Sequence, residues 1–407
     1  MHNITGQIVE RDDFYPRDAD LARFIDRLKH DHILLSAPRR FGKSSFVNHL
    51  AGHLRQEGWH VVSLNAEKYE SEFAFLDGFT SALEQLQVSP AGVARVRALL
   101  ARRISQVSRT ARESIRKVKL GGLLELELNA NDADALAADP LDSLFRELDS
   151  QPRRVLIAID EFPELLRAIR DSGPQGVQRL EAFLHWLRAL RQSHARQIRW
   201  LLYGSIGLDG FLEQHKLSKL AHGLLPLELT PLSKTEALDF LQRLAETHRL
   251  PLDLPARQAI LRTLGWPLPY FLQLMFESLR SLDATPITPA HVEQAFRNLL
   301  QPSRVMLYDH WRQRLEIQLE PEDRRLAHDT LVALSPAISG LTRAQLLSAL
   351  MLRRPQANPD DLNERLGSLL LVLRRDGYVV DLPAKSGRKY AFRSFLLREY
   401  WKSRFHD

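Results

Sequence analysis

The sequence contains no cysteine among its 407 residues. This absence excludes disulfide bonds, thiol catalysis and zinc sites with cysteine ligands. Long hydrophobic runs are also missing, because none approaches the roughly 20 apolar residues that a membrane helix needs. The first residues lack the basic start and apolar stretch of a secretory signal. We therefore expect a cytoplasmic protein without a transmembrane segment.

The chain as a whole has only a small excess of positive charge, and basic residues are concentrated in two segments. The formal net charge is +6. Segment 95–119 carries nine arginines and lysines against one acid, and segment 353–407 carries twelve basic residues against seven acids. The remainder is net acidic, so these two segments are the candidates for a surface that binds a polyanion.

Five short apolar runs alternate with helical patterns in the first part of the chain. The predicted strands lie within 32–38, 59–67, 153–166, 198–207 and 224–233. Near-continuous apolar strands separated by helices indicate a parallel sheet with helices on both faces. We predict an α/β P-loop domain over 1–232, with an insertion at 88–150.

The pattern becomes helical after Ser233. The SKTE motif at 233–236 is a capping box, which starts a helix. Helices are expected at 234–248, 255–264, 267–282 and 288–300, and then at 322–334, 342–353 and 359–376, before two strand-like runs. We predict a helical lid at 233–302 and a C-terminal winged-helix domain at 303–407.

A candidate phosphate loop follows the first predicted strand. The stretch APRRFGKS fits the pattern G-x-x-x-x-G-K-[ST] except at its opening position, Ala37. Gly42 allows close backbone approach, Lys43 can span the β- and γ-phosphates, and the Ser44 hydroxyl can bind Mg²⁺. An opening alanine fits if its φ is negative. The candidate nucleotide-binding residues are Ala37, Pro38, Arg39, Arg40, Phe41, Gly42, Lys43, Ser44 and Ser45. The alternative is a degenerate loop that holds no nucleotide.

An acidic pair ends the third predicted strand. The run VLIAIDE places Asp160 and Glu161 at a carboxyl end, where ligands bind in open α/β sheets. Asp160 would hold Mg²⁺ through water, and Glu161 would activate the attacking water. A solvated turn is the alternative for a lone Asp-Glu pair. Together with the phosphate loop, the pair predicts a site for ATP and Mg²⁺ with Lys43, Asp160 and Glu161 as catalytic residues.

The long spacing between Lys43 and Asp160 indicates the insertion. Within it, apolar residues recur in steps of three and four between 93 and 118 and define one helix face. Most basic residues of 95–119 lie on the opposite face. Such a helix binds nucleic acid, an anionic membrane or an acidic protein partner, or it packs on the sheet with a solvated arginine face.

Taken together, these motifs resemble a known family. The chain is similar to bacterial members of the archaeal-type ATPase family, which are AAA+-related P-loop proteins bordering the STAND class of signalling ATPases. The resemblance is carried by DDFYPRDADL, LLSAPRRFGKSS, IAIDEFPELL, LLYGSIGL, LTPLSKTEA, GWPLPYFL and the closing YAFRSFLLREYW. These stretches are specific for the family and not for a biological role.

The resemblance implies roles for further residues. Arg17 takes the family's Phe-x-Gly-Arg position near the nucleotide, with Pro16 in place of the glycine. Ser205 takes the sensor-1 place near the γ-phosphate and joins the candidate catalytic residues. Gly265 and Pro267 match the Gly-x-Pro element that packs against adenine, and an ordinary helix-breaking turn is the alternative. No sensor-2 arginine is evident.

The sequence leaves open what Arg39, Arg40 and the winged helix contact. Arg39 or Arg40 would act as an arginine finger in trans within a homo-oligomer, or would brace neighbouring acids. The winged helix would contact DNA phosphates or act as an internal lid on the nucleotide domain. Its candidate DNA-contacting residues are Arg365, Arg374, Arg375, Lys385, Arg388 and Lys389.

The expected function is an ATP-binding and hydrolysing switch whose domains rearrange with nucleotide state. One alternative is a DNA-binding helper ATPase of a mobile-element or replication-loader type, in which ATP controls assembly. Another is a signalling or defence scaffold with negligible turnover. DNA-stimulated turnover would favour the first alternative, and slow single-turnover behaviour would favour the second.

Overall fold

The computed structural model describes residues 1–9, 13–38, 40–86, 89–98, 100, 140–204, 208, 211–212, 217–304, 306–384 and 387–405. The chain forms two compact units. Unit 1 comprises Met1–Pro16, Ala37–Gly42 and Thr230–Asp407, and unit 2 comprises Arg17–Ser36 and Lys43–Leu229. Within the described ranges, no helix is long and apolar enough to cross a membrane. Most of the predicted basic helix at 95–119 lies outside these ranges.

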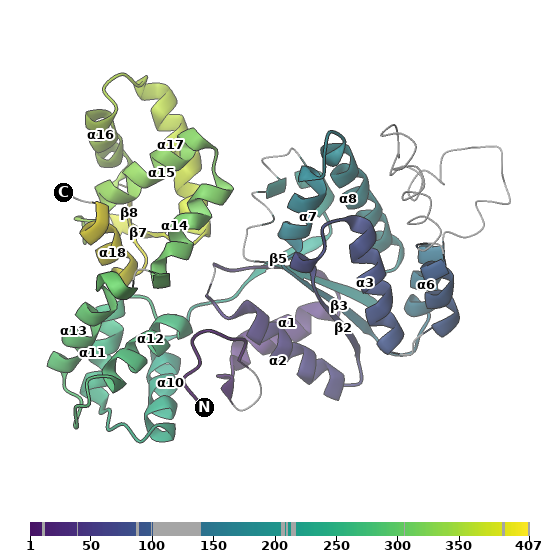
Figure 1. The fold of residues 1–407 in the computed structure, drawn as a ribbon, viewed down its shortest axis with the longest axis horizontal. Coiled ribbons are helices and arrows are strands. Elements are labelled where there is room, and N and C mark those ends of the chain that lie inside the picture. The colour runs from purple at the N-terminus through teal and green to yellow at the C-terminus, as the bar shows by residue number, and fades with distance from the viewer. Residues whose placement is uncertain are drawn as a thin grey trace. The chain divides into compact units, whose positions relative to one another are not determined.

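Unit 2 is built on a five-stranded parallel sheet (Figure 1). Its strands are β1 (His32–Ser36), β2 (His60–Asn65), β3 (Val155–Asp160), β4 (Ile198–Tyr203) and β5 (Leu224–Glu228), in the order β2-β3-β4-β1-β5. This confirms the predicted parallel α/β sheet. Each strand is shorter than the run predicted for it.

Helices cover both faces of this sheet (Figure 1). One face carries α1 (Asp18–Leu28) and α2 (Lys43–Gln56), and the other carries α3 (Glu72–Gln85), α6 (Pro140–Asp149), α7 (Phe162–Asp171) and α8 (Gly176–Ser193). Successive strand residues point to opposite faces. Ile157 and Ile159 therefore join the core formed with α3, α6, α7 and α8, whereas the alternating residues Leu156 and Ala158 do not.

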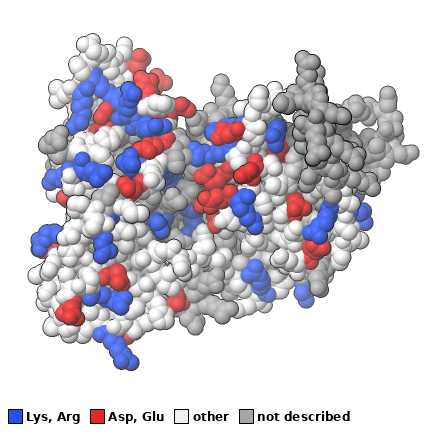
Figure 2. Space-filling view, viewed as in Figure 1, with Lys and Arg blue, Asp and Glu red and all other residues white. Residues whose placement is uncertain are grey.

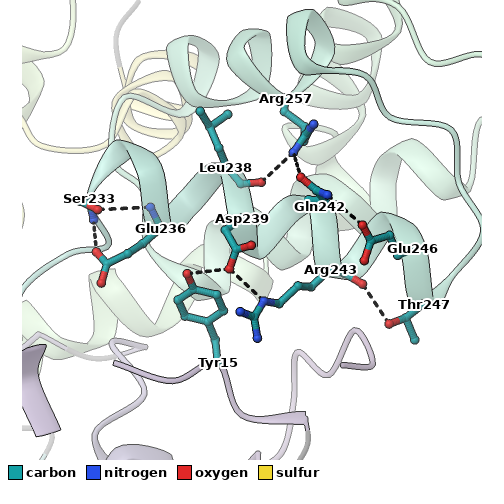
Figure 3. Close-up of polar contacts among 10 residues, drawn as sticks. All are labelled: Tyr15, Ser233, Glu236, Leu238, Asp239, Gln242, Arg243, Glu246, Thr247 and Arg257. Atoms are coloured by element: carbon teal, nitrogen blue, oxygen red, sulfur yellow. Dashed lines mark hydrogen bonds and ion pairs between the residues drawn. The ribbon is translucent and has the colours of Figure 1, made fainter. Parts of the chain in front are cut away.

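Unit 1 contains four helices over the segment predicted as a helical lid. The helices are α10 (Lys234–Thr247), α11 (Leu254–Leu264), α12 (Pro269–Arg280) and α13 (Pro289–Leu299). The predicted capping box is confirmed: the Glu236 N–H donates to Ser233 Oγ at 3.2 Å, and the Ser233 N–H donates to Glu236 Oε2 at 2.7 Å (Figure 3). These bonds satisfy amides that would otherwise be free at the start of α10.

The N-terminal segment packs on this helical part of unit 1. The Tyr15 hydroxyl donates to Asp239 Oδ2 at 3.0 Å, and Arg243 Nε donates to the same oxygen at 2.8 Å (Figure 3). The Arg243 guanidinium also lies over the Tyr15 ring, 5.3 Å from its centroid. Residues before Arg17 thus belong with α10, although the sequence places them next to the P-loop domain.

The C-terminal part of unit 1 has the predicted winged-helix elements. They are α14 (Met306–Gln318), α15 (Pro321–Leu334), β6 (Leu341–Thr342), α16 (Arg343–Arg353), α17 (Pro359–Arg375), β7 (Val379–Ala384), β8 (Gly387–Phe392) and α18 (Phe395–Phe405). The strands form an antiparallel sheet in the order β6-β8-β7. The helices α14 and α18 and the short strand β6 were not predicted. Trp311, Tyr378 and Trp401 are fully buried among these elements.

Candidate functional site

Two side chains far apart in sequence meet at the carboxyl edge of the unit 2 sheet. Ser44 lies in the first turn of α2, and Asp160 is the last residue of β3. The Ser44 hydroxyl donates a hydrogen bond to Asp160 Oδ2 at 2.6 Å, across 116 positions of sequence. Strand β4 separates β1 from β3 in the sheet, so the turn into α2 carries Ser44 across to Asp160. A hydroxyl and a carboxylate are both oxygen ligands that Mg²⁺ accepts.

Burial raises the pKa of the Asp160 carboxyl group above its usual range. The negative charge of Glu161 raises this pKa further, whereas the hydrogen bond from Ser44 and the positive charge of Lys43 lower it. Lys43 is itself only 8% exposed. The positive charge near Asp160 is thus too small to offset the cost of burying its ionised carboxylate. A divalent cation would supply that charge, so these residues fit Mg²⁺.

Glu161 occupies an unusual backbone position directly after Asp160. It is the N-cap of α7 with φ 49° and ψ 34°, in the left-handed region that side-chain-bearing residues rarely adopt. Its backbone N–H donates to Asp160 Oδ1 at 2.8 Å. This conformation turns the chain out of β3 and into α7. Strain of this kind concentrates at functional sites.

The first half of the phosphate loop packs within unit 1. Phe41 is 2% exposed and meets the Trp266 ring edge-on at 5.3 Å between centroids. Pro38 lies against Gly377, which follows α17: a Cβ added to Gly377 would lie 2.8 Å from Pro38 Cγ and 3.0 Å from Trp266 Cη2. Gly377 also has φ +85°, so both its conformation and its contact favour glycine. Aromatic packing therefore shapes this half of the loop.

Two of the described loop residues have a left-handed backbone. Gly42 has φ +81°, which glycine adopts readily, and Arg40 has φ 68°. Ala37 is not among the residues with positive φ, which is the condition for an alanine at the opening position. The Arg40 guanidinium lies over the Tyr270 ring, 4.7 Å from its centroid. Arg40 is thus held by an aromatic ring of α12.

Other predicted site residues have the following positions. Arg17 is 5% exposed, and its Nη1 donates to Asp20 Oδ2 at 3.2 Å. Gly265 ends α11 with φ 69°, and Pro267 lies in the turn before α12, so this segment has the geometry of a helix-breaking turn. Ser45 is buried in α2. Ser205 and Arg39 lie outside the described residues.

Acids accompany the basic residues of the winged helix. Arg365 pairs with Asp323 at 2.6 Å and Glu322 at 2.7 Å. Arg374 and Arg388 both pair with Asp381, at 2.9 and 3.4 Å. In Figure 2, basic side chains over α15–α17 lie beside acidic ones.

The start of α17 is acidic. Asp360 and Asp361 occupy its first turn, and Glu364 follows one turn later. In the helix-turn-helix motifs that read DNA, the N-terminal part of the recognition helix contacts bases, and phosphates surround it. The charges at the start of α17 therefore disfavour major-groove binding by this helix. Lys385 lies outside the described residues.

Two arginines of the predicted basic helix are described, and both have acidic partners. Arg95 pairs with Glu147, and Arg97 pairs with Glu84 at 2.9 Å. On the apolar side of the same segment, Val93, Val96 and Leu100 are buried in the unit 2 core. The start of this segment therefore packs on unit 2, and the rest of its predicted face lies outside the described residues.

Comparison with known proteins bears on the fold. No protein-family model and no curated protein matches the sequence. The structure is similar to that of the Aeropyrum pernix ORC2 protein in its ADPNP–ADP complexes, at 13% identity and a TM-score of 0.50, over 97% of this chain and 95% of that chain. It is also similar to Aeropyrum pernix ORC1 in complex with DNA, at 15% identity and a TM-score of 0.39, over 97% and 94%. The Thermotoga maritima RuvB Holliday junction branch migration motor matches at 13% identity and 0.40, over 93% of each chain. At 13% identity, the similarity to the ORC2 protein bears on the fold alone.

Sequence reasoning missed several residues around the loop and the acidic pair. Trp266 lies inside the recognised GWPLPYFL stretch, but its contact with Phe41 depends on residues 225 positions away. Glu164, in the first turn of α7, has a pKa raised mainly by burial, while its partner Arg167 lowers it. Gly204, at the end of β4, lies against Glu161 and Pro163. A signal for Gly204 was present, because it directly precedes the expected sensor position.

Proposed function

We propose that the chain binds ATP with Mg²⁺ on the loop Ala37–Ser45, hydrolyses it, and acts as a nucleotide-controlled switch related to the archaeal-type ATPases and the STAND class. The observation that carries this proposal is the 2.6 Å hydrogen bond between Ser44 and Asp160. It brings the hydroxyl of the phosphate-loop motif to the acid of the second motif. A chance Gly-Lys-Ser would have no reason to meet a strand-end aspartate.

Each of these residues has its own role in the proposed reaction. Backbone amides of the loop and the side chain of Lys43 bind phosphate oxygens. Ser44 and Asp160 hold Mg²⁺, which neutralises charge on the phosphates. Glu161 orients a water molecule and takes its proton. The buried surroundings of Asp160, which raise its pKa, support this division, because they favour a bound cation.

The switch part of the proposal rests on how the loop is divided. The boundary between the two units falls between Gly42 and Lys43. Residues before this boundary pack on Trp266 and Tyr270, and residues after it begin α2. A change in the loop on nucleotide binding would act along the continuous chain on both units. We propose that the functional domains are the P-loop domain 1–232, the lid 233–302 and the winged helix 303–407.

Binding and turnover measurements test the proposal. We expect Asp160→Ala to weaken ATP binding in Mg²⁺ but not in EDTA, because it removes a cation ligand. Glu161→Gln is expected to keep ATP binding and to slow phosphate release by about 10²-fold or more, the usual contribution of a general base. Glu181→Gln on α8 is the control, since the Glu181 side chain is 55% exposed.

Three outcomes would contradict parts of the proposal. Equal ATP affinity in Mg²⁺ and EDTA would contradict the metal site, and normal turnover of Glu161→Gln would contradict the assigned base. A wild-type protein that binds ATP and does not turn it over would indicate a scaffold. Repeating the assay with duplex DNA, together with a particle mass, tests the DNA-helper alternative and the homo-oligomer.

A further inference from the structure

The end of β4 lies against the first turn of α7 in unit 2. Strands β3 and β4 are paired in parallel, with Ile159 opposite Leu202. The chain leaving β3 continues through Glu161 into α7, and the chain leaving β4 continues to Gly204. Gly204 is buried at this place. Its neighbours are the side chains of Glu161 and Pro163.

The space beside Gly204 has no room for a side chain. A Cβ placed on Gly204 would lie 2.6 Å from Pro163 Cδ, 3.2 Å from Pro163 Cγ and 3.2 Å from Glu161 Oε2. Carbon atoms in contact normally lie about 3.5–4.0 Å apart. Gly204 has no positive φ, so the requirement for glycine here comes from this contact and not from its backbone conformation.

The nearest atom cannot move independently of the backbone. Pro163 Cδ belongs to a ring bonded to the backbone nitrogen, and Pro163 lies in the first turn of α7. Glu161, two residues earlier, is held in the left-handed region as the N-cap of the same helix. A methyl group on Gly204 would therefore displace the turn that carries Glu161, by a distance on the order of 1 Å.

We propose that Gly204 is a positioning residue for hydrolysis: by lacking a side chain, it lets Pro163 and the first turn of α7 seat against β4, which sets where the Glu161 carboxylate lies. This inference rests on the proposed function, in which Glu161 activates water. It predicts an effect on turnover and not on ATP binding, because the residues that bind ATP and Mg²⁺ lie on the loop, on α2 and at Asp160.

The test compares Gly204→Ala, Pro163→Ala, the double variant and Gly52→Ala. Gly52 is the matched control, because it lies in α2 of the same unit and a Cβ there would meet no atom within 4 Å. We expect Gly204→Ala to keep its ATP dissociation constant and to lose kcat by about 10–10²-fold, as small misplacements of reacting groups do. The double variant is expected to recover kcat to near that of Pro163→Ala, because the closest contact is gone.

Each outcome decides the inference. It is overturned if Gly204→Ala turns over like Gly52→Ala, if its ATP affinity falls in step with kcat, or if the double variant is no better than Gly204→Ala. Should Gly204→Ala fail to fold, the double variant decides: a folded protein with the kcat of Pro163→Ala supports the inference, and failure to fold overturns it. A wild type without turnover contradicts the proposed function and this inference together, whereas normal turnover in Gly204→Ala contradicts the inference alone.

Discussion

The two halves of the phosphate loop lie in different chemical surroundings. Before the boundary at Gly42, the loop is packed by aromatic rings of unit 1, with Phe41 against Trp266 and Arg40 over Tyr270. After it, the loop enters unit 2, where Ser44 bonds to Asp160 and Lys43 lies near the same carboxylate. Aromatic packing in unit 1 therefore sets the shape of the first half of the loop, and charged groups in unit 2 set the electrostatics of the second half.

This difference separates two kinds of experiment. Substitutions after the boundary remove charges that would contact phosphate or Mg²⁺ directly, so their effects on ATP affinity should be large. Substitutions before it change packing that supports the loop, so their effects should be smaller and should depend on the supporting ring. Of the four predictions below, ordered from the largest expected effect to the smallest, the first and the last test this contrast, and the other two concern the interior of unit 2.

Lys43→Ala should remove most ATP binding. It deletes the one loop cation of unit 2, and charge-assisted hydrogen bonds to two phosphates are together worth about 3–6 kcal/mol, more than 10²-fold in affinity. Titration of labelled ATP measures the change. The control is Lys29→Ala, an exposed lysine at the end of α1 in the same unit. Binding by Lys43→Ala that equals the control would place the nucleotide elsewhere.

Arg179→Leu should strongly destabilise unit 2 without a direct effect on the loop. Arg179 donates to both carboxylate oxygens of Glu72, at 2.8 and 2.7 Å, and joins α8 to α3. Glu72 is only 3% exposed, so loss of its partner leaves a buried charge and costs about 3–5 kcal/mol. Urea unfolding measures this. Arg146→Leu, whose side chain is 71% exposed, should cost less than about 1 kcal/mol. Similar losses for the two variants would contradict the prediction.

His32 should give the unit 2 sheet a defined pH dependence. The pKa of His32 is lowered to about 4, mainly by burial; a hydrogen bond to the Arg191 carbonyl and the charge of Asp31 act in the raising direction, and the charges of Arg191 and Arg199 in the lowering direction. The backbone N–H of Trp200 donates to Nδ1, so Nε2 carries the proton and donates to Arg191 O at 3.0 Å. Protonation of Nδ1 would break the bond from Trp200.

The sign of this dependence follows from the lowered pKa. The unfolded chain binds a proton at His32 below about pH 6.5, and the folded chain does so only near pH 4. The stability from neutral His32 is therefore full above pH 6.5 and is lost as the pH falls. Between pH 7 and 5 the wild type should lose about 2 kcal/mol more than His32→Asn. His53→Asn, at a side chain that is 40% exposed, is the control, and equal pH slopes in wild type and His32→Asn would contradict the prediction.

Local patterns in the sequence predicted the sheet and the helices that start with clear caps. The five strands and the capping box at Ser233 follow from apolar runs and short-range hydrogen bonding. The meeting of Ser44 with Asp160 was also predictable, because the phosphate-loop pattern and the strand-end acid both lie at the carboxyl edge of one parallel sheet. Helix α14 was missed although Tyr308, Trp311 and Leu315 are buried at helical spacing, since many charged residues separate them.

Contacts between residues far apart in the chain could not be predicted from the sequence. Nothing local indicates that Phe41 meets Trp266, that Pro38 meets Gly377, or that residues before Arg17 join α10. The acidic partners of the winged-helix arginines were equally hidden: Arg365 is paired with residues 42 and 43 positions earlier. Charge counts therefore overstated the basic character of this segment, because counting cannot see which charges are already paired.

Arg40 gives the smallest and most discriminating effect. Its guanidinium lies 4.7 Å from the Tyr270 centroid, and a cation–π contact at an exposed site is worth about 0.5–1 kcal/mol. If Arg40 acts by holding the loop against α12, Arg40→Ala should weaken ATP binding a few-fold in the wild type and hardly at all in a Tyr270→Leu background. The difference between the two backgrounds is the coupling energy.

A direct role of Arg40 predicts the opposite result. If Arg40 contacts nucleotide, in its own chain or in a neighbouring copy, Arg40→Ala should cause the same loss of affinity or turnover in both backgrounds, because Tyr270 would not be needed. Arg243→Ala is the matched control: this arginine also lies over a tyrosine ring, Tyr15, at 5.3 Å, and its contact is remote from the loop in sequence. It should leave ATP affinity unchanged in either background. The double-mutant cycle thus distinguishes a bracing arginine from an arginine finger. Only a bracing role makes the effect of Arg40→Ala depend on the Tyr270 ring.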